Sequence, residues 1–298
     1  MSAMDRAIAY ALPLVPKAIV RRIASRYIAG ETPEDALRTA ERLNQEGFRA
    51  TMDILGEDVW DFEQARKAAE GYGSLLEEIH RRRVDSNVSI KLTQFGLKVD
   101  KSLCCRLAVE IVQKARDLGN FIRIDMEDSS CTSDTLDVFR SLRMRFTNVG
   151  VAVQAYLRRT ADDVESLDDL NPNFRLCKGV YVEPREIAYR DMEIINRNYL
   201  FLLEGMLRRG RYVGIATHDE RLVWEAMRLI RELRLPTSAY EFQMLLGVDE
   251  QLRDIIRGAG HPVRIYIPFG RDWYAYSVRR LRENPRIAGY VLKQVLSS

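Results

Sequence analysis

The stretch VRIYIPFGRDWYAYSVRRLRENPRIAGYVLK (Val263–Lys293) contains the structural unit that recurs along the chain. Tyr266 points to the opposite face from Ile265 and Ile267, and this alternation predicts a strand. We expect the strand to end at the Pro-Phe-Gly sequence 268–270, where a turn leads into a helical segment. A strand, a turn and a helix in this order form the basic unit of α/β folds.

The helical segment after this turn has two chemically different faces. An apolar stripe is formed by Tyr274, Val278 and Leu281, and the opposite side carries Tyr276, Arg279, Arg280 and Glu283. This pattern is typical of a solvated helix surface. Two adjacent guanidinium groups just beyond a strand end could also bind a carboxylate through charge-assisted hydrogen bonds. Spacing alone leaves both interpretations open.

Seven further apolar stretches precede this unit, and each is followed by turn residues and a longer helical pattern. The eight expected strands are Ala50–Glu57, Asn87–Gly96, Phe121–Asp128, Val149–Leu157, Phe174–Tyr181, Tyr212–His218, Ala239–Leu245 and Val263–Gly270. Eight strands alternating with helices in 298 residues predict a (β/α)8 barrel of the TIM type, in preference to an open doubly wound sheet. No G-x-G-x-x-G motif is present, so no Rossmann dinucleotide site is expected.

We expect residues 1–47 to form a helical extension packed on a barrel of residues 48–298. Thr32 as N-cap and Pro33 at the first helical position predict a helix that ends at Gly47. The apolar stretch Ala7–Pro16 is too short to span a bilayer and lacks the flanks of a signal peptide. It is expected to be a helix that packs on the domain, with contact at a membrane surface as the alternative.

Composition and charge exclude several classes of protein. An apolar content of 46% excludes a disordered or fibrous chain, and the net charge of +3 without basic runs argues against nucleic-acid binding. The cysteines form neither a C-x-x-C pair nor a framework with the three histidines. We therefore expect a reducing compartment, buried thiols and no metal site.

Strand alternation indicates which side chains point into the barrel. Apolar neighbours face the surrounding helices, so the residues between them point inward: Lys91, Asp125, Gln154, Arg175, Glu241, Gln243 and Tyr266. Barrel interiors are normally apolar, and unpaired charges there are costly. Five of them on different strands, Lys91, Asp125, Gln154, Arg175 and Tyr266, therefore predict a polar site at the C-terminal mouth, where barrel enzymes hold their active sites. The structural alternative for the charged members is a salt bridge, with Lys91 and Asp125 as the expected pair.

In order along the chain, the motifs SIKL, IRIDMED, VQAYLRR, RLCKGVY, ATH, EFQMLLG, RIYIPFG and WYAYSVRRLRENP resemble those of monofunctional bacterial proline dehydrogenase. The resemblance extends from Phe48 to Lys293. It implies a distorted (β/α)8 barrel that binds FAD non-covalently. It also implies oxidation of L-proline to 1-pyrroline-5-carboxylate by hydride transfer from proline C5 to flavin N5, the first step of proline catabolism to glutamate.

The resemblance implies roles for individual residues. Lys91, Arg279 and Arg280 would bind the proline carboxylate, and Tyr266 and Leu245 would pack against the ring. Asp125 would organise the lysine and tyrosine side, and Glu57 would pair with Arg279 as a gate.

On the cofactor side, Gln154 and Arg175 would lie at the isoalloxazine edge, with Arg175 near N5. The ribityl chain and phosphates would be reached by Lys178, Gly179, Thr217 and His218, with Glu283 also near the cofactor. Asp219 stands where an asparagine is common in the family, which places an acid beside the phosphate-binding loop.

The resemblance further implies a quinone or another membrane electron acceptor, and pyrroline-5-carboxylate dehydrogenase as a partner. The expected location is cytoplasmic, with peripheral contact at the inner face of the cell membrane. Two other functions stay open, namely a Schiff-base lyase or aldolase that uses Lys91 and a flavin-binding barrel without catalysis. Hydroxyproline also stays open as a substrate.

Overall fold

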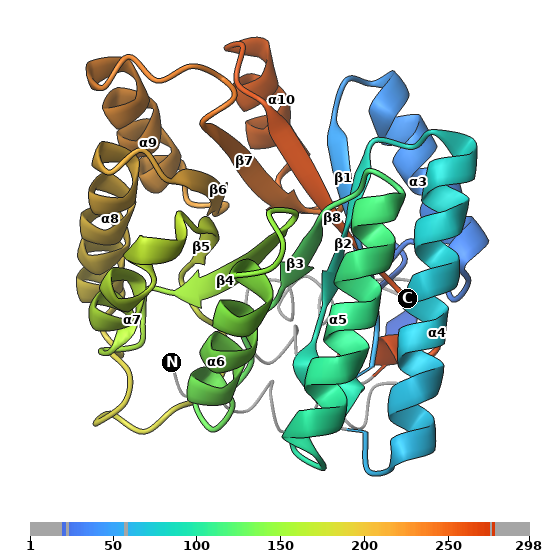
Figure 1. Cartoon of the computed structure of the whole chain (residues 1–298). Coiled ribbons are helices and arrows are strands. Elements are labelled where there is room, and N and C mark those ends of the chain that lie inside the picture. The colour runs from blue at the N-terminus through green and yellow to red at the C-terminus, as the bar shows by residue number, and fades with distance from the viewer. Residues whose placement is uncertain (1–19, 22–23, 57–58, 275, 278–298) are drawn as a thin grey trace.

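The computed structural model describes residues 20–21, 24–56, 59–274 and 276–277. The chain forms a closed barrel of parallel strands in the order β1-β2-β3-β4-β5-β6-β7-β8, and its helices surround the barrel (Figure 1). The predicted (β/α)8 barrel is thereby confirmed.

Each expected strand is present, although several end earlier than the apolar stretch does. The strands are β1 Arg49–Ile54, β2 Ser86–Ile90, β3 Ile122–Ile124, β4 Val149–Gln154, β5 Asn173–Cys177, β6 Tyr212–Ala216, β7 Tyr240–Leu245 and β8 Val263–Phe269. The stretch Asn87–Gly96 shows why the ends differ. After Ile90 the chain enters the 3-10 helix η2, Leu92–Phe95, whose apolar side chains are also buried. Apolar character therefore reports burial here rather than strand structure.

The helices lie outside the strands, where they cover the outward apolar faces. They are α3 Pro33–Gln45, α4 Phe62–Arg82, α5 Lys101–Asp117, α6 Thr132–Arg143, α7 Thr160–Ser166, α8 Met192–Arg208, α9 Glu220–Glu232 and α10 Glu250–Gly258, with a second 3-10 helix, η3, at Asp168–Leu170. Val88, Ile90, Ile122 and Ile124 are fully buried beneath this layer. Burial of such side chains is the main favourable contribution to the stability of the fold.

The start of α3 forms as its sequence predicts. The Thr32 side chain accepts a hydrogen bond from the Asp35 N–H, and the Asp35 carboxylate accepts one from the Thr32 N–H, so the two residues form a capping box. The helix packs against β1 and β8. The stretch Ala7–Pro16 lies outside the described residues, so the packing of that stretch stays a prediction.

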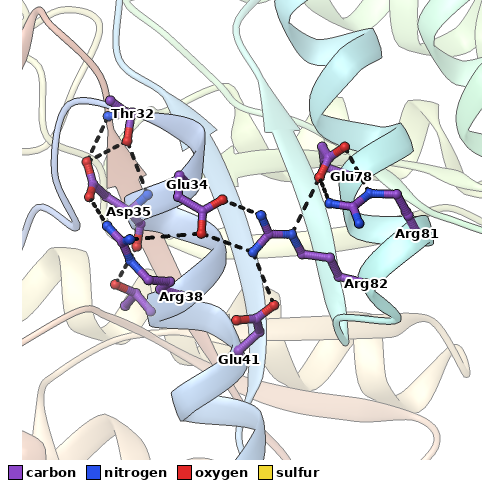
Figure 2. A network of polar contacts seen from close by, with 9 residues as sticks. Thr32, Glu34, Asp35, Arg38, Glu41, Glu78, Arg81 and Arg82 are labelled. Atoms are coloured by element: carbon purple, nitrogen blue, oxygen red, sulfur yellow. Dashed lines mark hydrogen bonds and ion pairs between the residues drawn. The ribbon is translucent and has the colours of Figure 1, made fainter.

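A network of surface charges connects α3 to α4. Figure 2 shows Arg82 of α4 between Glu34 and Glu41 of α3, with Glu78 of its own helix on the other side. The Arg82 guanidinium lowers the pKa of Glu34, and the Arg81 guanidinium does the same for Glu78. The network fastens α3 to α4. In the part of the chain that the structure describes, no helix is long and apolar enough to cross a membrane.

Candidate active site

A cavity of about 710 Å³ opens at the carboxyl end of the barrel. Its wall is built from residues within and just beyond β2 to β8, because all parallel strands end on the same side of a barrel. Every described residue that the sequence predicts for the site lines this one cavity: Lys91, Asp125, Gln154, Arg175, Lys178, Gly179, Thr217, His218, Leu245 and Tyr266. Glu57, Arg279, Arg280 and Glu283 lie outside the described residues.

Lys91 forms its close ion pair with Asp53, a residue that the sequence analysis missed. The ammonium Nζ lies 2.6 Å from Asp53 Oδ1 and 2.7 Å from Oδ2. Lys91 is 6% exposed and Asp53 is fully buried. The expected pairing of Lys91 with Asp125 is wrong as the primary contact, because Asp53 on the adjacent strand β1 offers both of its carboxylate oxygens.

Asp125 instead receives hydrogen bonds from across the barrel. The Tyr266 hydroxyl group on β8 donates to Asp125 Oδ2 at 2.9 Å, and Arg175 Nη1 on β5 donates to Oδ1. Arg175 Nη1 also donates to Ser89 Oγ at 3.0 Å, and the guanidinium carbon lies 5.3 Å from the centre of the Tyr266 ring. The inward orientation predicted for Asp125, Arg175 and Tyr266 is confirmed, since none of these bonds joins neighbouring strands.

Arg175 is held from its other side by β7. Its Nε donates to Gln243 Oε1 at 2.5 Å, and Gln243 Nε2 donates to Glu241 Oε1 at 2.7 Å. Arg264 Nε on β8 donates to the same Glu241 oxygen at 2.6 Å. Six side chains are thus joined end to end in a circuit that leaves β8 at Arg264 and returns to it at Tyr266. We call this set the polar circuit: Arg264, Glu241, Gln243, Arg175, Asp125 and Tyr266.

Burial and neighbouring charges set the protonation states in this region. Burial raises the pKa of the Tyr266 hydroxyl group well above its ordinary range, and the Asp125 carboxylate adds to the effect, so the tyrosine remains a hydrogen-bond donor. Burial also raises the pKa of Asp53, against the effect of the Lys91 ammonium. Burial of Glu241 acts in the same direction, but the Arg264 guanidinium more than offsets it and holds the Glu241 pKa below its usual value.

The loops after β5 and β6 meet around a second ion pair. Lys178 Nζ lies 2.7 Å from Asp219 Oδ2, and Asp219 also caps helix α9 by accepting from the N–H groups of Arg221 and Leu222. Burial raises the Asp219 pKa, but the hydrogen bond from Lys178 and the cap lower it below the ordinary value. A carboxylate therefore already occupies the positive end of this helix.

His218 and Leu245 contact each other within the cavity wall. His218 Nε2 accepts a hydrogen bond from the Leu245 backbone N–H at 2.9 Å, which requires that this ring nitrogen carry no proton. His218 thus helps to hold the segment that presents Leu245, in addition to lining the cavity itself.

Sequence reasoning missed two residues that shape the interior. Asp53 alternates with Met52 and Ile54, and that pattern could have identified it as an inward residue of the first stretch. Arg264 alternates in the same way with Val263 and Ile265 and binds Glu241.

The chemistry of the remaining candidates is limited. Among the described residues, no group of histidine, cysteine and acidic side chains is arranged to hold a metal ion. All four cysteines are free thiols, and burial raises the pKa of Cys104 and Cys131, the latter to about 11. Cys104 and Cys131 are therefore poor nucleophiles.

Comparison with known proteins identifies the family. The family model described as proline dehydrogenase matches residues 36–292. The chain belongs to the proline dehydrogenase family. It is 38% identical to proline dehydrogenase of Deinococcus radiodurans and 36% identical to proline dehydrogenase 1 of Bacillus subtilis subsp. natto, over 92% of this chain and 90% of each relative.

A solved structure with the same barrel is proline utilization A (PutA) from Bdellovibrio bacteriovorus inactivated by N-propargylglycine. It has a TM-score of 0.83 and 26% sequence identity, and the match covers 89% of this chain but 33% of that protein. The chain therefore corresponds to about a third of that larger protein. Its relationship to the two bacterial relatives of similar length supports an enzyme of proline catabolism.

The cavity has features that suit FAD, the cofactor that the family resemblance implies. Gln154 is 2% exposed and lines the cavity, and its Oε1 has no hydrogen-bond partner, although Nε2 donates to the carbonyl groups of Met126 and Glu127. A buried acceptor without a partner is costly and calls for a donor. The cavity also offers Arg175 and Lys178 to an anionic, partly aromatic ligand, and its volume is in the range of cofactor sites. The residues that line the cavity therefore fit FAD.

Proposed function

We propose that this chain oxidises L-proline to 1-pyrroline-5-carboxylate with non-covalently bound FAD, and that the electrons pass on to a quinone. The observation that carries the proposal is the convergence of Lys91, Arg175 and Tyr266 on one cavity within a chain of this family. When bound, FAD would supply the hydride acceptor at N5.

The residues of the chain would orient the substrate. Lys91, with Arg279 and Arg280 from the segment outside the described residues, would bind the proline carboxylate. Tyr266 and Leu245 would pack against the ring and leave little room for larger amino acids. A carboxylate fixed at several points holds C5 in one place, and such positioning can contribute about 7–11 kcal/mol to lowering the barrier.

The cofactor would be held along the wall formed by β4, β5 and β6. Gln154 Oε1 is free to accept a hydrogen bond from the isoalloxazine edge, and Arg175 would place a positive charge beside it. Lys178, Gly179, Thr217 and His218 would contact the ribityl chain and phosphates. A cation at the ring favours the transfer of negative charge onto the cofactor.

The geometry disfavours the Schiff-base alternative for Lys91. A nucleophilic lysine must be neutral, whereas contacts of 2.6 and 2.7 Å to a buried carboxylate stabilise the ammonium form. Borohydride trapping with a carbonyl substrate should therefore leave Lys91 unmodified.

The proposal is tested by adding L-proline anaerobically to the purified flavoprotein and recording its visible spectrum. We expect the flavin bands to bleach, and bands that persist would contradict the proposal. A 4-hydroxyproline titration in parallel determines the substrate preference.

Two sets of variants test the roles assigned from the sequence. Arg279→Lys and Arg280→Lys should each raise the proline KM by at least about tenfold with flavin retained, since lysine cannot form the paired contact. Glu57→Ala should change proline affinity and turnover if Glu57 gates the site through Arg279. Unchanged kinetics in Glu57→Ala would exclude the gate.

A further inference from the structure

Gln243 bridges two strands that are not neighbours. It lies on β7 and accepts a hydrogen bond from Arg175 Nε on β5, while β6 runs between them. Its amide orientation is fixed from both ends, because Nε2 faces the Glu241 carboxylate and Oε1 faces the guanidinium. A flipped amide would direct its NH2 group at the cation and its oxygen at the anion.

Gly214 on β6 provides the space that this bridge needs. It is paired in register with Arg175 on one side and with Glu241 on the other. A Cβ atom at position 214 would lie 2.5 Å from Gln243 Nε2 and 2.8 Å from its Cδ. Gly214 is not among the glycines with positive φ, so the backbone does not require glycine there. The absence of a side chain is what lets the glutamine cross the strand.

The bridge leaves one nitrogen of Arg175 without a partner among the described residues. Nε is occupied by Gln243, and Nη1 by Ser89 and Asp125. Among the described residues Nη2 has no hydrogen-bond partner, and Arg175 lines the cavity. The three contacts on Nε and Nη1 determine the plane of the guanidinium group and therefore the direction of Nη2.

We infer that Gln243 is a positioning residue that sets the orientation of Arg175 toward the cofactor, and that Gly214 is required for it to do so. The inference rests on the proposed function, because the orientation is detected through bound FAD. Without the acceptor on Nε, Asp125 and Ser89 are the hydrogen-bond partners that remain for the guanidinium among the described residues, and it turns toward them. Its positive charge then stabilises the reduced cofactor less.

The test compares three variants by the midpoint potential of the bound FAD and by proline kinetics. Gly214→Ala displaces Gln243 without changing a charge, and Gln243→Leu removes the acceptor. Gly150→Ala is the steric control: a Cβ atom there would lie 2.5 Å from Arg123 Nη1 and 2.5 Å from the backbone oxygen of Asn173, so it crowds the interior at least as severely without touching Gln243. Flavin content and melting temperature are measured for each variant, to separate repositioning from loss of fold.

We expect Gly214→Ala and Gln243→Leu to disfavour reduction of the flavin at least tenfold, a fall of about 30 mV for a two-electron couple. The kcat should fall by at least about tenfold, while the proline KM changes by less than about threefold, because the proposed carboxylate ligands are other residues. Gly150→Ala should leave the potential unchanged. If Gly214→Ala does not fold, Gln243→Leu alone decides the question.

Unchanged potentials in both Gly214→Ala and Gln243→Leu, with flavin retained, would overturn the inference. An equal fall in Gly150→Ala would also overturn it, because general loosening of the barrel would then explain the effect. Failure of the proposed function gives a different result from failure of this inference. Proline would then not reduce the flavin of the wild-type protein, whereas the midpoint potentials of wild type and variants could still be compared.

Discussion

Replacing Asp53 with asparagine tests whether this buried carboxylate holds Lys91 in place. The two side chains are almost inaccessible, and the Asp53 oxygens lie 2.6 and 2.7 Å from the ammonium. Asparagine keeps the shape and one oxygen acceptor but removes the charge. The change therefore removes the charge together with one of the two hydrogen bonds to the ammonium.

The magnitude follows from this geometry. At an effective dielectric constant of about 20, charges at 2.7 Å attract by about 6 kcal/mol, and desolvation of the two ions opposes most of that gain. Removing one partner of a buried pair costs about 3–5 kcal/mol, because the other charge is left uncompensated. For a chain of 298 residues, a loss of about 3 kcal/mol corresponds to a fall of about 5 °C in the melting temperature.

The assay is thermal unfolding of Asp53→Asn, Lys91→Met and the double variant, with proline kinetics of Asp53→Asn. The double variant should recover most of the stability that Asp53→Asn loses, because it leaves no buried charge without a partner. The proline KM of Asp53→Asn should rise, since Lys91 loses the group that orients it. A melting temperature within about 1 °C of wild type for Asp53→Asn would refute the reasoning. A double variant no more stable than Asp53→Asn would refute it too.

Three other variants test separate parts of the molecule. Asp219→Asn should tighten binding of FAD but not of riboflavin in a fluorescence titration, because it removes an anion that competes with phosphate for Lys178 and the α9 N-terminus; equal effects on both flavins would contradict this. The pKa of Asp219 is lowered in the folded state, so the stability that the Asp219 carboxylate contributes is present above about pH 4 and is lost as the pH falls through the folded-state pKa. The difference in melting temperature between wild type and Asp219→Asn should therefore disappear on acidification. Tyr266→Phe removes the donor 2.9 Å from Asp125 and should cost about 1–2 kcal/mol in denaturant unfolding while raising the proline KM, and an unchanged unfolding midpoint would count against the bond. Arg82→Gln should lower the melting temperature at low salt, and the loss should shrink in about 1 M NaCl; a loss independent of salt would show that packing rather than charge connects α3 and α4.

The sequence predicts the barrel well because the signal is repeated along the whole chain. Each strand alternates apolar and inward residues and is followed by a helix, so an error at one strand end leaves the fold class unchanged. The ends themselves are less certain from the sequence, since Leu92 and Phe95 are as deeply buried in η2 as strand residues are. Alternation also predicts which polar side chains point inward, and it does so correctly for Asp125, Arg175 and Tyr266.

Alternation does not predict which inward residues meet. Lys91 and Asp125 follow adjacent strands and were expected to pair, yet Asp53 on the other side of β2 receives the ammonium. The choice depends on the stagger between strands and on the reach of a flexible side chain, and neither can be determined from one strand at a time. Gly214 shows the same limit, because its role depends on a glutamine that crosses it from another strand.

The polar circuit restricts how this chain can evolve. Its six members share buried hydrogen bonds, so replacing an inner member removes one bond from each of two neighbours, and the costs of single substitutions should sum to more than the cost of replacing the members together. Because both ends of the circuit lie on β8, a shift of that strand disturbs the floor of the cavity from two directions at once. The polar circuit therefore links the side chains of the cavity to the strand pairing that closes the barrel. An evolved variant with a different activity would have to replace these side chains as a group.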